Sequence, residues 1–484
     1  MSDRTLAQQL GAFAAAVDAA SLPEAVDASV RRRVLDVVGI CVRATELDTS
    51  RAVAEHVAEQ GGTAAATGIG LGARVPAAAA AFLNGVLAHS LDYDDTHLPS
   101  VLHPSASVVP AALAAAEAAG ADGAATLAAI AVGIEVTIRI GMAGYLVTDG
   151  GGRNEWFEHG QHATSICGAL GSAAAAAMLV GHDRPRAERA ELVTQAVAVA
   201  ASMSSGVIEA NRTGGTVKRL HCGLAAQAGV SAAQLVARGL TGAPTALEGR
   251  FGFFTAWLRD AWRPEAVTDG LGEVWSVPDI FYKPYPANHF THAGIDAAIE
   301  LRRGGLRPED VASAHLGVAG PTVRTIGEPL DVKQRPETGY QAQFSGPYTV
   351  AAALEGGGGL GLGLADFTDE AARDPRRRAL MARITVGADP RCDAIYPAQF
   401  PASLTVHTTD GRTLEAFVAA NRGGPERPLR EDELVAKYAD NVAGLLEPEV
   451  AEATRVACLG LGERRDVAGV LPARLPVSSG PGFR

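Results

Sequence analysis

The spacing of apolar residues predicts helices over most of the first 270 residues. Ala-rich segments place apolar side chains three and four positions apart, which is the repeat of one helix face. Glycines such as Gly120 and Gly239 close several of these segments. The predicted helices are 23–44, 76–90, 104–119, 124–144, 163–180, 187–205 and 221–238. Because Ala and Gly let helices approach closely, we expect a compact bundle.

The pattern changes near Val277, where alanine becomes sparser and β-type segments begin. These segments are 312–318, 382–386, 402–408 and 413–419, with helical patterns at 291–303 and 347–355 between and before them. Thr409-Asp410-Gly411 is a strong hairpin signal, and the pattern is helical again from Arg430. We therefore predict a mainly α protein, in which a large all-helical domain (1–278 and 425–484) is interrupted by a smaller α+β lid domain (279–424).

Length and charge limit the classes of function. A chain of 484 residues is too long for one compact core, which favours two domains. The net charge of −12 argues against nucleic acid or an anionic membrane as the main partner, but not against a small anionic substrate. We see no uncharged apolar run of about 18 residues and expect no membrane span. Five scattered cysteines without a CxxC pair fit a reducing cytoplasm.

Lysine is rare in this chain. Of the 42 basic residues, only four are lysines, namely Lys218, Lys283, Lys333 and Lys437. The chain therefore uses arginine wherever a general surface cation is sufficient. A lysine that remains is a candidate for a compact ammonium with a tunable pKa. Lys218 and Lys283 are flanked by turn residues and apolar groups, so partial desolvation would strengthen their hold on a carboxylate or an enolate. The alternative for each is an ordinary surface lysine.

The densest group of titratable residues lies in the predicted loop between helices 76–90 and 104–119. Within twelve residues it holds three carboxylates, a hydroxyl and two imidazoles, namely Asp92, Asp94, Asp95, Thr96, His97 and His103. His103 and His162 each precede a predicted helix, and a helix N-terminus disfavours imidazolium and attracts anions. We therefore expect two neutral histidines that can exchange protons with a bound carboxylate. The alternative is a pair of capping histidines.

Asp92, Asp94 and Asp95 could alternatively form a metal site. An Asp-rich stretch on a helical scaffold is similar to the magnesium-binding motif of terpene cyclases. Those enzymes need a second metal-binding motif and an aromatic-lined cavity, whereas we find no convincing second motif and aromatic residues make up only 5% of this chain. A structural metal at Asp94 and Asp95 is the other alternative. We favour solvated or hydrogen-bonded loop carboxylates.

Six separated blocks of the sequence together resemble one known family. They are NGVLAHSLDYDDTH, HPSASVVPAALAAAE, GQHATSICGALGSAAAAAMLVG, KRLHCGLAAQAGVSAAQLVARGLTGAPTALEGRFGFF, KPYPANHFTHAGIDAAIEL and AQFSGPYTVAAAL. Their order and spacing resemble the MmgE/PrpD family, which includes 2-methylcitrate dehydratases, cis-aconitate decarboxylases and an iminodisuccinate epimerase. The resemblance implies a helical domain with an α+β lid, a homodimer, and an active site between the two domains that uses no metal and no organic cofactor.

The resemblance also implies a set of site residues. Carried over by motif, they are Asp92, Thr96, His103, His162, Lys218, Lys283 and Tyr348. Arg219 and His292 are further candidates for contact with the substrate. The chain departs from the decarboxylase-type pattern at Asn288, where that pattern has a histidine five residues after the lid lysine. This departure weakens the assignment to cis-aconitate decarboxylation specifically.

These observations predict a cofactor-independent lyase, located in the cytoplasm, that acts on a small di- or tricarboxylate. His103 is expected to carry the proton with help from His162, while Lys218 and Lys283 bind carboxylates and stabilise enolate-like charge. Asp92 and Thr96 would orient His103 or a substrate hydroxyl, and Tyr348 would donate from the lid. We rank a dehydratase first, an epimerase or isomerase second and a decarboxylase third. A non-catalytic binding protein is the alternative from another class.

Overall fold

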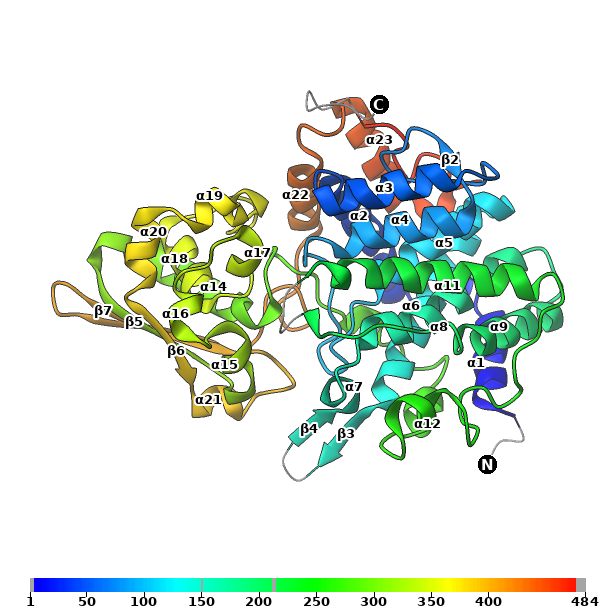
Figure 1. The fold of residues 1–484 in the computed structure, drawn as a ribbon, viewed down its shortest axis with the longest axis horizontal. Helices are drawn as coiled ribbons and strands as arrows, with labels where there is room; N and C mark the ends of the chain where they lie inside the picture. Colours follow the sequence, from blue (N-terminus) through cyan, green and yellow to red (C-terminus); the bar gives the residue numbers. More distant parts are fainter. Residues whose placement is uncertain (1–3, 149–150, 211–214, 476–484) are drawn as a thin grey trace. The chain divides into compact units, whose positions relative to one another are not determined.

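A computed structural model of the chain describes residues 4–148, 151–210 and 215–475. Its chain forms two compact units, called unit 1 (Met1–Ile280 with Tyr438–Arg484) and unit 2 (Phe281–Lys437). Helices outnumber strands in both units (Figure 1), which confirms the predicted mainly α class. The chain returns to unit 1 at Tyr438, within a helix, whereas the sequence pattern placed this return at residue 425.

Unit 1 is built from long helices whose bounds follow the apolar pattern closely. They are α1 (Leu6–Ala16), α2 (Glu24–Ala44), α3 (Asp48–Gln60), α4 (Ala77–His89), α5 (Ser105–Ala119), α6 (Gly123–Ala143), α8 (Ala163–Val180), α9 (Arg186–Ala200) and α11 (His221–Val236). Shorter helices are α7 (Glu155–Glu158), α12 (Phe253–Leu258) and α13 (Glu265–Thr268). From the chain's return come α22 (Glu431–Val442), which runs across the boundary at Tyr438, and α23 (Pro448–Leu459).

The all-helical prediction for this part of the chain was wrong in detail. Two small antiparallel pairs lie in unit 1: β1 (Ala66–Thr67) with β2 (Arg74–Val75), and β3 (Tyr145–Thr148) with β4 (Gly151–Asn154). Strands of two to four residues are too short to show an alternating apolar pattern, so they leave little trace in the sequence.

The core of unit 1 is formed by α8, which packs against α5, α6, α9 and α11. Small residues let these helices approach. A Cβ added to Gly223 in α11 would lie 2.5 Å from the carbonyl oxygen of Phe82 in α4, and one added to Gly85 would lie 2.8 Å from the Cα of Gly223. The two glycines therefore hold α4 and α11 in backbone contact. That contact brings the last residue of α4, His89, toward the first residue of α11, His221.

Two helices of unit 1 are long and apolar enough to cross a membrane by composition alone. They are α6 and α8, so the expectation that the chain has no such run was too strict. In each, the most apolar window is largely buried inside unit 1, at 89% and 94% respectively. Buried core helices of soluble proteins have the same length and composition, and we interpret both as core helices.

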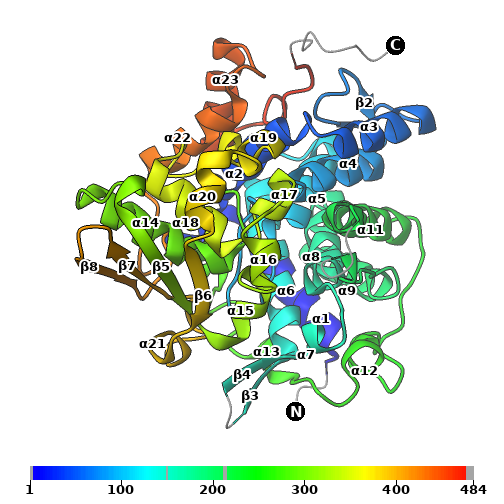
Figure 2. The same cartoon turned by 60° about the vertical axis from the view of Figure 1, so that its left-hand side comes forward.

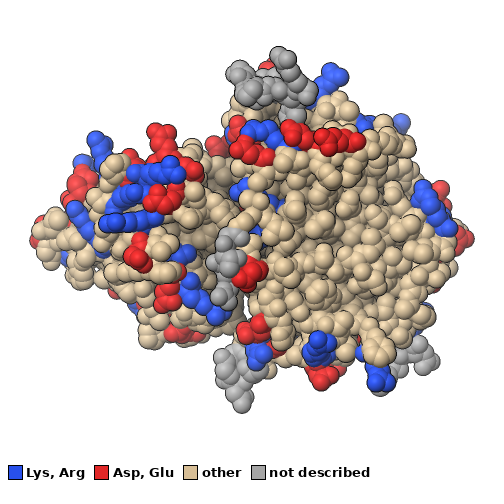
Figure 3. Space-filling model, viewed as in Figure 1, with Lys and Arg blue, Asp and Glu red and all other residues tan. Residues whose placement is uncertain are grey.

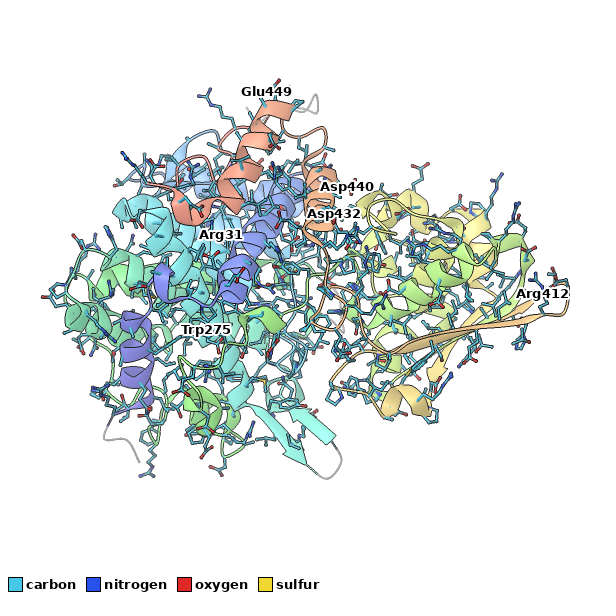
Figure 4. The ribbon with its side chains drawn as sticks, turned by 180° about the vertical axis from the view of Figure 1, so that it is seen from behind. Arg31, Trp275, Arg412, Asp432, Asp440 and Glu449 are labelled. Atoms are coloured by element: carbon cyan, nitrogen blue, oxygen red, sulfur yellow. The ribbon has the colours of Figure 1, made fainter. Side chains whose placement is uncertain are left out.

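The C-terminal return is fastened to α2. Arg31 in α2 donates to the carbonyl oxygen of Leu459 at 3.0 Å and to Glu463 Oε2 at 2.8 Å (Figure 4). Near the other end of unit 1, the ring of Trp275 lies 5.5 Å from that of Phe13 in α1. The two contacts tie distant segments of the chain to the first two helices.

Unit 2 contains a four-stranded sheet with helices packed on it (Figure 2). The strand order is β6 (Ile384–Ala388), β5 (Val311–Val318), β7 (Ala402–Thr408), β8 (Thr413–Val418), with only the β5–β6 pair parallel. The predicted hairpin at Thr409-Asp410-Gly411 is confirmed, because it joins β7 to β8. The helices are α14 (His292–Arg303), α15 (Gly320–Ile326), α16 (Leu330–Lys333), α17 (Gly339–Ala342), α18 (Gly346–Glu355), α19 (Asp369–Ala372), α20 (Pro375–Met381) and α21 (Pro390–Asp393).

Candidate active site

The loop between α4 and α5 is buried, although it is rich in titratable groups. Asp92, Asp94, Asp95 and Thr96 are each at most 5% exposed. Asp92 has a φ of 52°, a left-handed conformation that aspartate tolerates better than most residues. A non-glycine residue held there costs free energy, which the surrounding packing must offset. The loop is therefore fixed in place rather than solvated, contrary to one of the two alternatives drawn from the sequence.

Asp95 anchors this loop to α2. Its Oδ2 lies 2.8 Å from Arg33 Nη1 and also accepts a hydrogen bond from the Ser105 hydroxyl at the start of α5. Arg33 donates further to the carbonyl oxygen of Ile280 at 2.7 Å. Burial raises the pKa of Asp95, and the neighbouring guanidinium opposes that rise. These contacts use Asp95 as a structural residue, in agreement with the hydrogen-bonded reading of the loop.

His103 stands at the end of the loop, ahead of α5. Its Nδ1 lies 2.5 Å from the carbonyl oxygen of Asp95, 3.3 Å from Thr96 Oγ1 and 3.9 Å from Asp94 Oδ2. A carbonyl can only accept, so Nδ1 carries a hydrogen and Nε2 is left to face other partners. The His103 backbone N–H donates to Thr164 Oγ1 in α8 at 3.3 Å. The contacts at Nδ1 orient the ring, and the backbone hydrogen bond ties His103 to α8.

His162 and His221 form a hydrogen-bonded pair. His162 is the N-cap residue of α8, His221 begins α11, and their Nδ1 atoms are 2.8 Å apart. Burial lowers the pKa of His162 well below its usual value, and the positive potential of His89, Lys218 and His221 lowers it further. Burial, then His89 and Lys218, lower the pKa of His221 to about 4. Both rings are therefore neutral near pH 7, and one donates its Nδ1–H to the other.

A fourth imidazole completes the group. His89, at the end of α4, is bonded through Nδ1 to Asp94 Oδ2 at 2.7 Å, and both side chains are buried. Its ring centroid lies 5.4 Å from that of His103 and 5.5 Å from that of His162. The His162 and His221 centroids are 4.8 Å apart. We call His89, His103, His162 and His221 the histidine cluster.

Lys218 supplies positive charge beside the histidine cluster. Its Nζ lies 3.6 Å from Asp92 Oδ1, and its side chain is only 14% exposed. Its field contributes to the lowered pKa values of both His162 and His221. The neighbouring Arg219 is directed elsewhere, because its Nη1 donates to Thr49 Oγ1 in α3 at 2.8 Å. The structure therefore unites Lys218, Asp92 and the histidines, and places Arg219 against α3.

Three buried residues near the cluster could in principle hold a metal ion. Ligand atoms of His89, Asp94 and Cys222 lie within 4.8 Å of one another. Burial raises the pKa of the Cys222 thiol well above its usual value, so that the thiol keeps its proton, whereas metals take the thiolate. His89 Nδ1 and Asp94 Oδ2 are already hydrogen-bonded to each other. This donor set fits a hydrogen-bonded His–Asp pair better than a metal centre.

The site residues expected in unit 2 begin with Lys283, which is 1% exposed. His292, the first residue of α14, donates from Nε2 to the carbonyl oxygen of Ala287 at 3.1 Å. Its ring lies 4.6 Å from the ring of His289, centroid to centroid. Asn288 serves the local backbone, since its Oδ1 accepts from the Phe290 N–H at 3.1 Å. His289, the next residue, does not cap the short helix that begins there, because the N-cap residue is Asn288.

Tyr348 lies inside unit 2 with its hydroxyl engaged. In α18 it is completely buried, its hydroxyl donates to the carbonyl oxygen of Asp366, and it accepts from Arg377 Nη1 at 2.6 Å. The Arg377 guanidinium also lies 5.1 Å from the Tyr348 ring centroid. Burial raises the pKa of the phenol to about 12. These contacts are those of a structural tyrosine in unit 2 and offer no support for the catalytic role suggested by the resemblance.

Family comparisons agree with the sequence blocks. A model of the MmgE/PrpD N-terminal domain matches residues 8–265, and one of the MmgE/PrpD C-terminal domain matches residues 285–461. The chain belongs to the MmgE/PrpD family. Human cis-aconitate decarboxylase is 29% identical over 393 residues, covering 78% of this chain and 75% of that protein. Cis-aconitate decarboxylase of Aspergillus terreus is 25% identical over 425 residues, covering 83% and 82%.

Within this family member, sequence reasoning missed two residues of the cluster. His89 reads as the last residue of an apolar helix, and His221 as the first residue of another. Both lie in the blocks that carry the resemblance, AHSLDYDDTH and KRLHCG. The sequence held one signal, since His89 lies close to Asp92 and His221 lies close to Lys218. However, only the contact of α4 with α11 shows that the two histidines belong to one site.

Proposed function

We propose that this member of the MmgE/PrpD family is a lyase that acts on a small di- or tricarboxylate. The observation that carries the proposal is the histidine cluster with Lys218 and Asp94 beside it. Imidazoles held in such a cluster can exchange a proton with a carbon next to a carboxylate. The largely buried ammonium of Lys218 adds the positive charge that an anionic substrate and its enolate-like intermediate require.

The chemistry explains why charge stabilisation matters. A carbon acid beside a carboxylate is very weakly acidic, so most of the barrier is the charge that develops on the substrate. In dehydration, one imidazole takes the proton from carbon, and a second group protonates the departing hydroxide to give water. In decarboxylation, the C–CO₂ electrons remain on carbon and a proton from the protein replaces the lost carboxylate. The same residues serve both reactions.

We assign the roles as follows. His103 is the principal proton carrier, supported by its fixed Nδ1 and by Thr96 at 3.3 Å. His162 assists as a neutral imidazole, and Lys218 binds a substrate carboxylate, with Asp92 holding its Nζ at 3.6 Å. Lys283 in unit 2 is proposed as a second carboxylate ligand, a role that rests on the family motif and on its burial.

Two leaving groups compete, and one observation favours each. We rank loss of water, from a substrate like 2-methylcitrate, first, because Asn288 replaces the histidine of the decarboxylase-type pattern and caps a local backbone N–H. Loss of CO₂ from a substrate like cis-aconitate is the second candidate, because the curated relatives are cis-aconitate decarboxylases. An epimerase would need the same intermediate and would return the proton to the opposite face.

The test is incubation of the full chain with 2-methylcitrate, citrate, cis-aconitate and iminodisuccinate in D₂O, followed by NMR. A new alkene signal with loss of the hydroxyl-bearing carbon indicates dehydration, loss of one carboxylate indicates decarboxylation, and deuterium exchange alone indicates epimerisation. Stoichiometric binding of these carboxylates without exchange or turnover would favour the non-catalytic binding protein and contradict the lyase proposal.

We also propose a homodimer in the cytoplasm. The support for the dimer is an uncharged face of unit 1, seen as the broad tan area on the right of Figure 3, where Figure 1 places α11. None of the 16 residues of α11 is Lys, Arg, Asp or Glu, and Leu224, Gln227 and Leu235 on its outer side are partly or fully exposed. Depletion of charge is typical of interface cores.

Five buried cysteines without a disulfide support a reducing compartment.

A further inference from the structure

We infer that His89 is an additional proton-transfer residue of this site, and that Asp94 is its positioning residue. The inference rests on the proposed lyase function and deepens it. Neither residue was assigned chemistry from the sequence, where Asp94 reads as a loop carboxylate and His89 as the end of an apolar helix. The structure assigns them to each other.

The first observation is the orientation of the ring. Asp94 Oδ2 lies 2.7 Å from His89 Nδ1, and the two side chains are 0% and 1% exposed, so the hydrogen bond is not exchanged with water. An ionised carboxylate only accepts, so Nδ1 carries the hydrogen. With its hydrogen on Nδ1, the ring can present a lone pair only at Nε2, which is the nitrogen that would act as a base.

The second observation is that this lone pair is unused. His89 Nε2 is buried and has no hydrogen-bond partner among the described residues. A buried polar atom left in this state costs free energy and calls for an explanation, of which a catalytic role is one. The rings of His103 and His162 both lie near the ring of His89, at 5.4 and 5.5 Å between centroids. Nε2 is thus an open acceptor inside the histidine cluster.

Together these contacts distinguish the role of His89 from the roles of the other three histidines. Lyase chemistry of the proposed kind needs one group to take a proton from carbon and another to deliver one. The Nδ1 atoms of His162 and His221 are hydrogen-bonded to each other, and His103 Nδ1 donates to the carbonyl oxygen of Asp95. His89 alone in the cluster is backed directly by a carboxylate at hydrogen-bond distance. When Nε2 accepts a proton, Asp94 stabilises the resulting imidazolium, as a buried aspartate does in Asp–His pairs.

Kinetics on the substrate that the wild-type chain converts provide the first arm of the test. We expect His89→Gln to lower kcat at least about 100-fold with KM within about threefold, because a general acid or base contributes chiefly to the chemical step. Asp94→Asn is expected to lower kcat at least about tenfold by disturbing the tautomer. The control is His97→Gln, which makes the same change at another buried histidine, bonded to Ser100 Oγ at 2.6 Å, and should leave kcat within about threefold.

The second arm needs no turnover. In the ¹⁵N spectrum of the full chain with labelled histidine, His89 is identified by its loss in folded His89→Gln. We expect Nδ1 to be protonated, Nε2 to be unprotonated, and the Nε2 signal to shift when tricarballylate, an unreactive tricarboxylate, is added. An Nε2–H tautomer, or unchanged kcat in His89→Gln, overturns the inference. If the wild type converts no substrate in the panel, the proposed reactions fail separately while the tautomer still decides the role of His89.

Discussion

At the scale of single residues, the site keeps two of its imidazoles, those of His162 and His221, neutral by burying them next to other positive groups. His162 and His221 are each 3% exposed, and the pKa of each is lowered, first by burial and then by neighbours that include Lys218. A neutral imidazole can act as a base without first losing a proton to solvent, which suits abstraction of a weakly acidic proton. The buried Lys218 thus serves two purposes, because it attracts an anion and helps to keep the bases ready.

The hydrogen bond between His162 and His221 predicts a graded mutant series. His221→Phe removes the partner of His162 Nδ1 and leaves a buried polar atom unsatisfied, at a cost of about 1–3 kcal/mol. We expect kcat to fall at least about tenfold, since the orientation of His162 is lost. His221→Asn, whose amide can restore the bond, should recover much of this loss. Equal activities of the two variants in steady-state kinetics would contradict a positioning role for His221.

His97 predicts a pH dependence of stability. Burial lowers the pKa of His97 to about 4, whereas an unfolded histidine titrates near its ordinary value of 6.5. Between these values the unfolded chain binds a proton that the folded chain does not, so His97 costs stability as pH falls from 6.5 toward 4, by up to roughly 3 kcal/mol. Above pH 6.5 both states are neutral and the effect vanishes.

The measurement is urea unfolding of the wild type and of His97→Gln at a series of pH values. The free energy of unfolding of the wild type should fall more steeply with decreasing pH than that of the variant. The difference between the two should be constant above pH 6.5. Parallel curves down to pH 4 would show that His97 is not held neutral by the fold.

At the scale of elements, strong apolar periodicity made the helices of unit 1 predictable from the sequence. The predicted segment 163–180 coincides with α8, and 23–44 differs from α2 by one residue. The pattern failed where no such repeat exists. It missed the β3–β4 hairpin, and it placed α9 as far as residue 205 although the helix ends at Ala200. The paired residues of β3 and β4 are near neighbours in the sequence, but strands of four residues are too short to show an alternating apolar pattern.

The site was predictable only in part. The expected proximity of Asp92, Thr96 and His103 follows from one short loop, whereas the rarity of lysine indicated Lys218 and a place before a predicted helix indicated His162. His89 and His221 are separated by more than a hundred residues, and only the glycine contact of α4 with α11 brings them to one cluster. The motif residue Tyr348 accepts a hydrogen bond from Arg377 inside unit 2, a contact that no local pattern indicated, and its role in the reaction stays a prediction.

The contact of α4 with α11 predicts the effect of a single methyl group. In Gly223→Ala, the new Cβ would lie 2.5 Å from the carbonyl oxygen of Phe82, so the helices must separate. We expect a destabilisation of about 1–3 kcal/mol and a lower kcat, because His89 and His221 move apart. Gly358→Ala adds the same methyl in a loop of unit 2, where the nearest atom is 3.9 Å away, and should change the melting temperature little. Equal melting temperatures of the two variants would contradict close packing at Gly223.

At the scale of the whole molecule, the proposed dimer predicts the effect of a charge on α11. Leu235 is 44% exposed on a helix without charged residues. In Leu235→Arg, association would require burial of an unpaired guanidinium, which is strongly unfavourable. Light scattering after size-exclusion chromatography should show a dimer for the wild type and a monomer for the variant. The control is Val450→Arg in α23, which is 41% exposed and should stay dimeric. A wild-type monomer would refute the dimer.

His103 offers the most direct test of the proposed chemistry. Its ring is oriented by the Asp95 carbonyl and Thr96, beside Asp94. In the D₂O assay on whichever carboxylate the wild type converts, His103→Ala should lower kcat/KM at least about 100-fold, while the variant keeps the wild-type melting temperature within a few degrees. Full activity of folded His103→Ala on that substrate would contradict proton transfer by the histidine cluster as described.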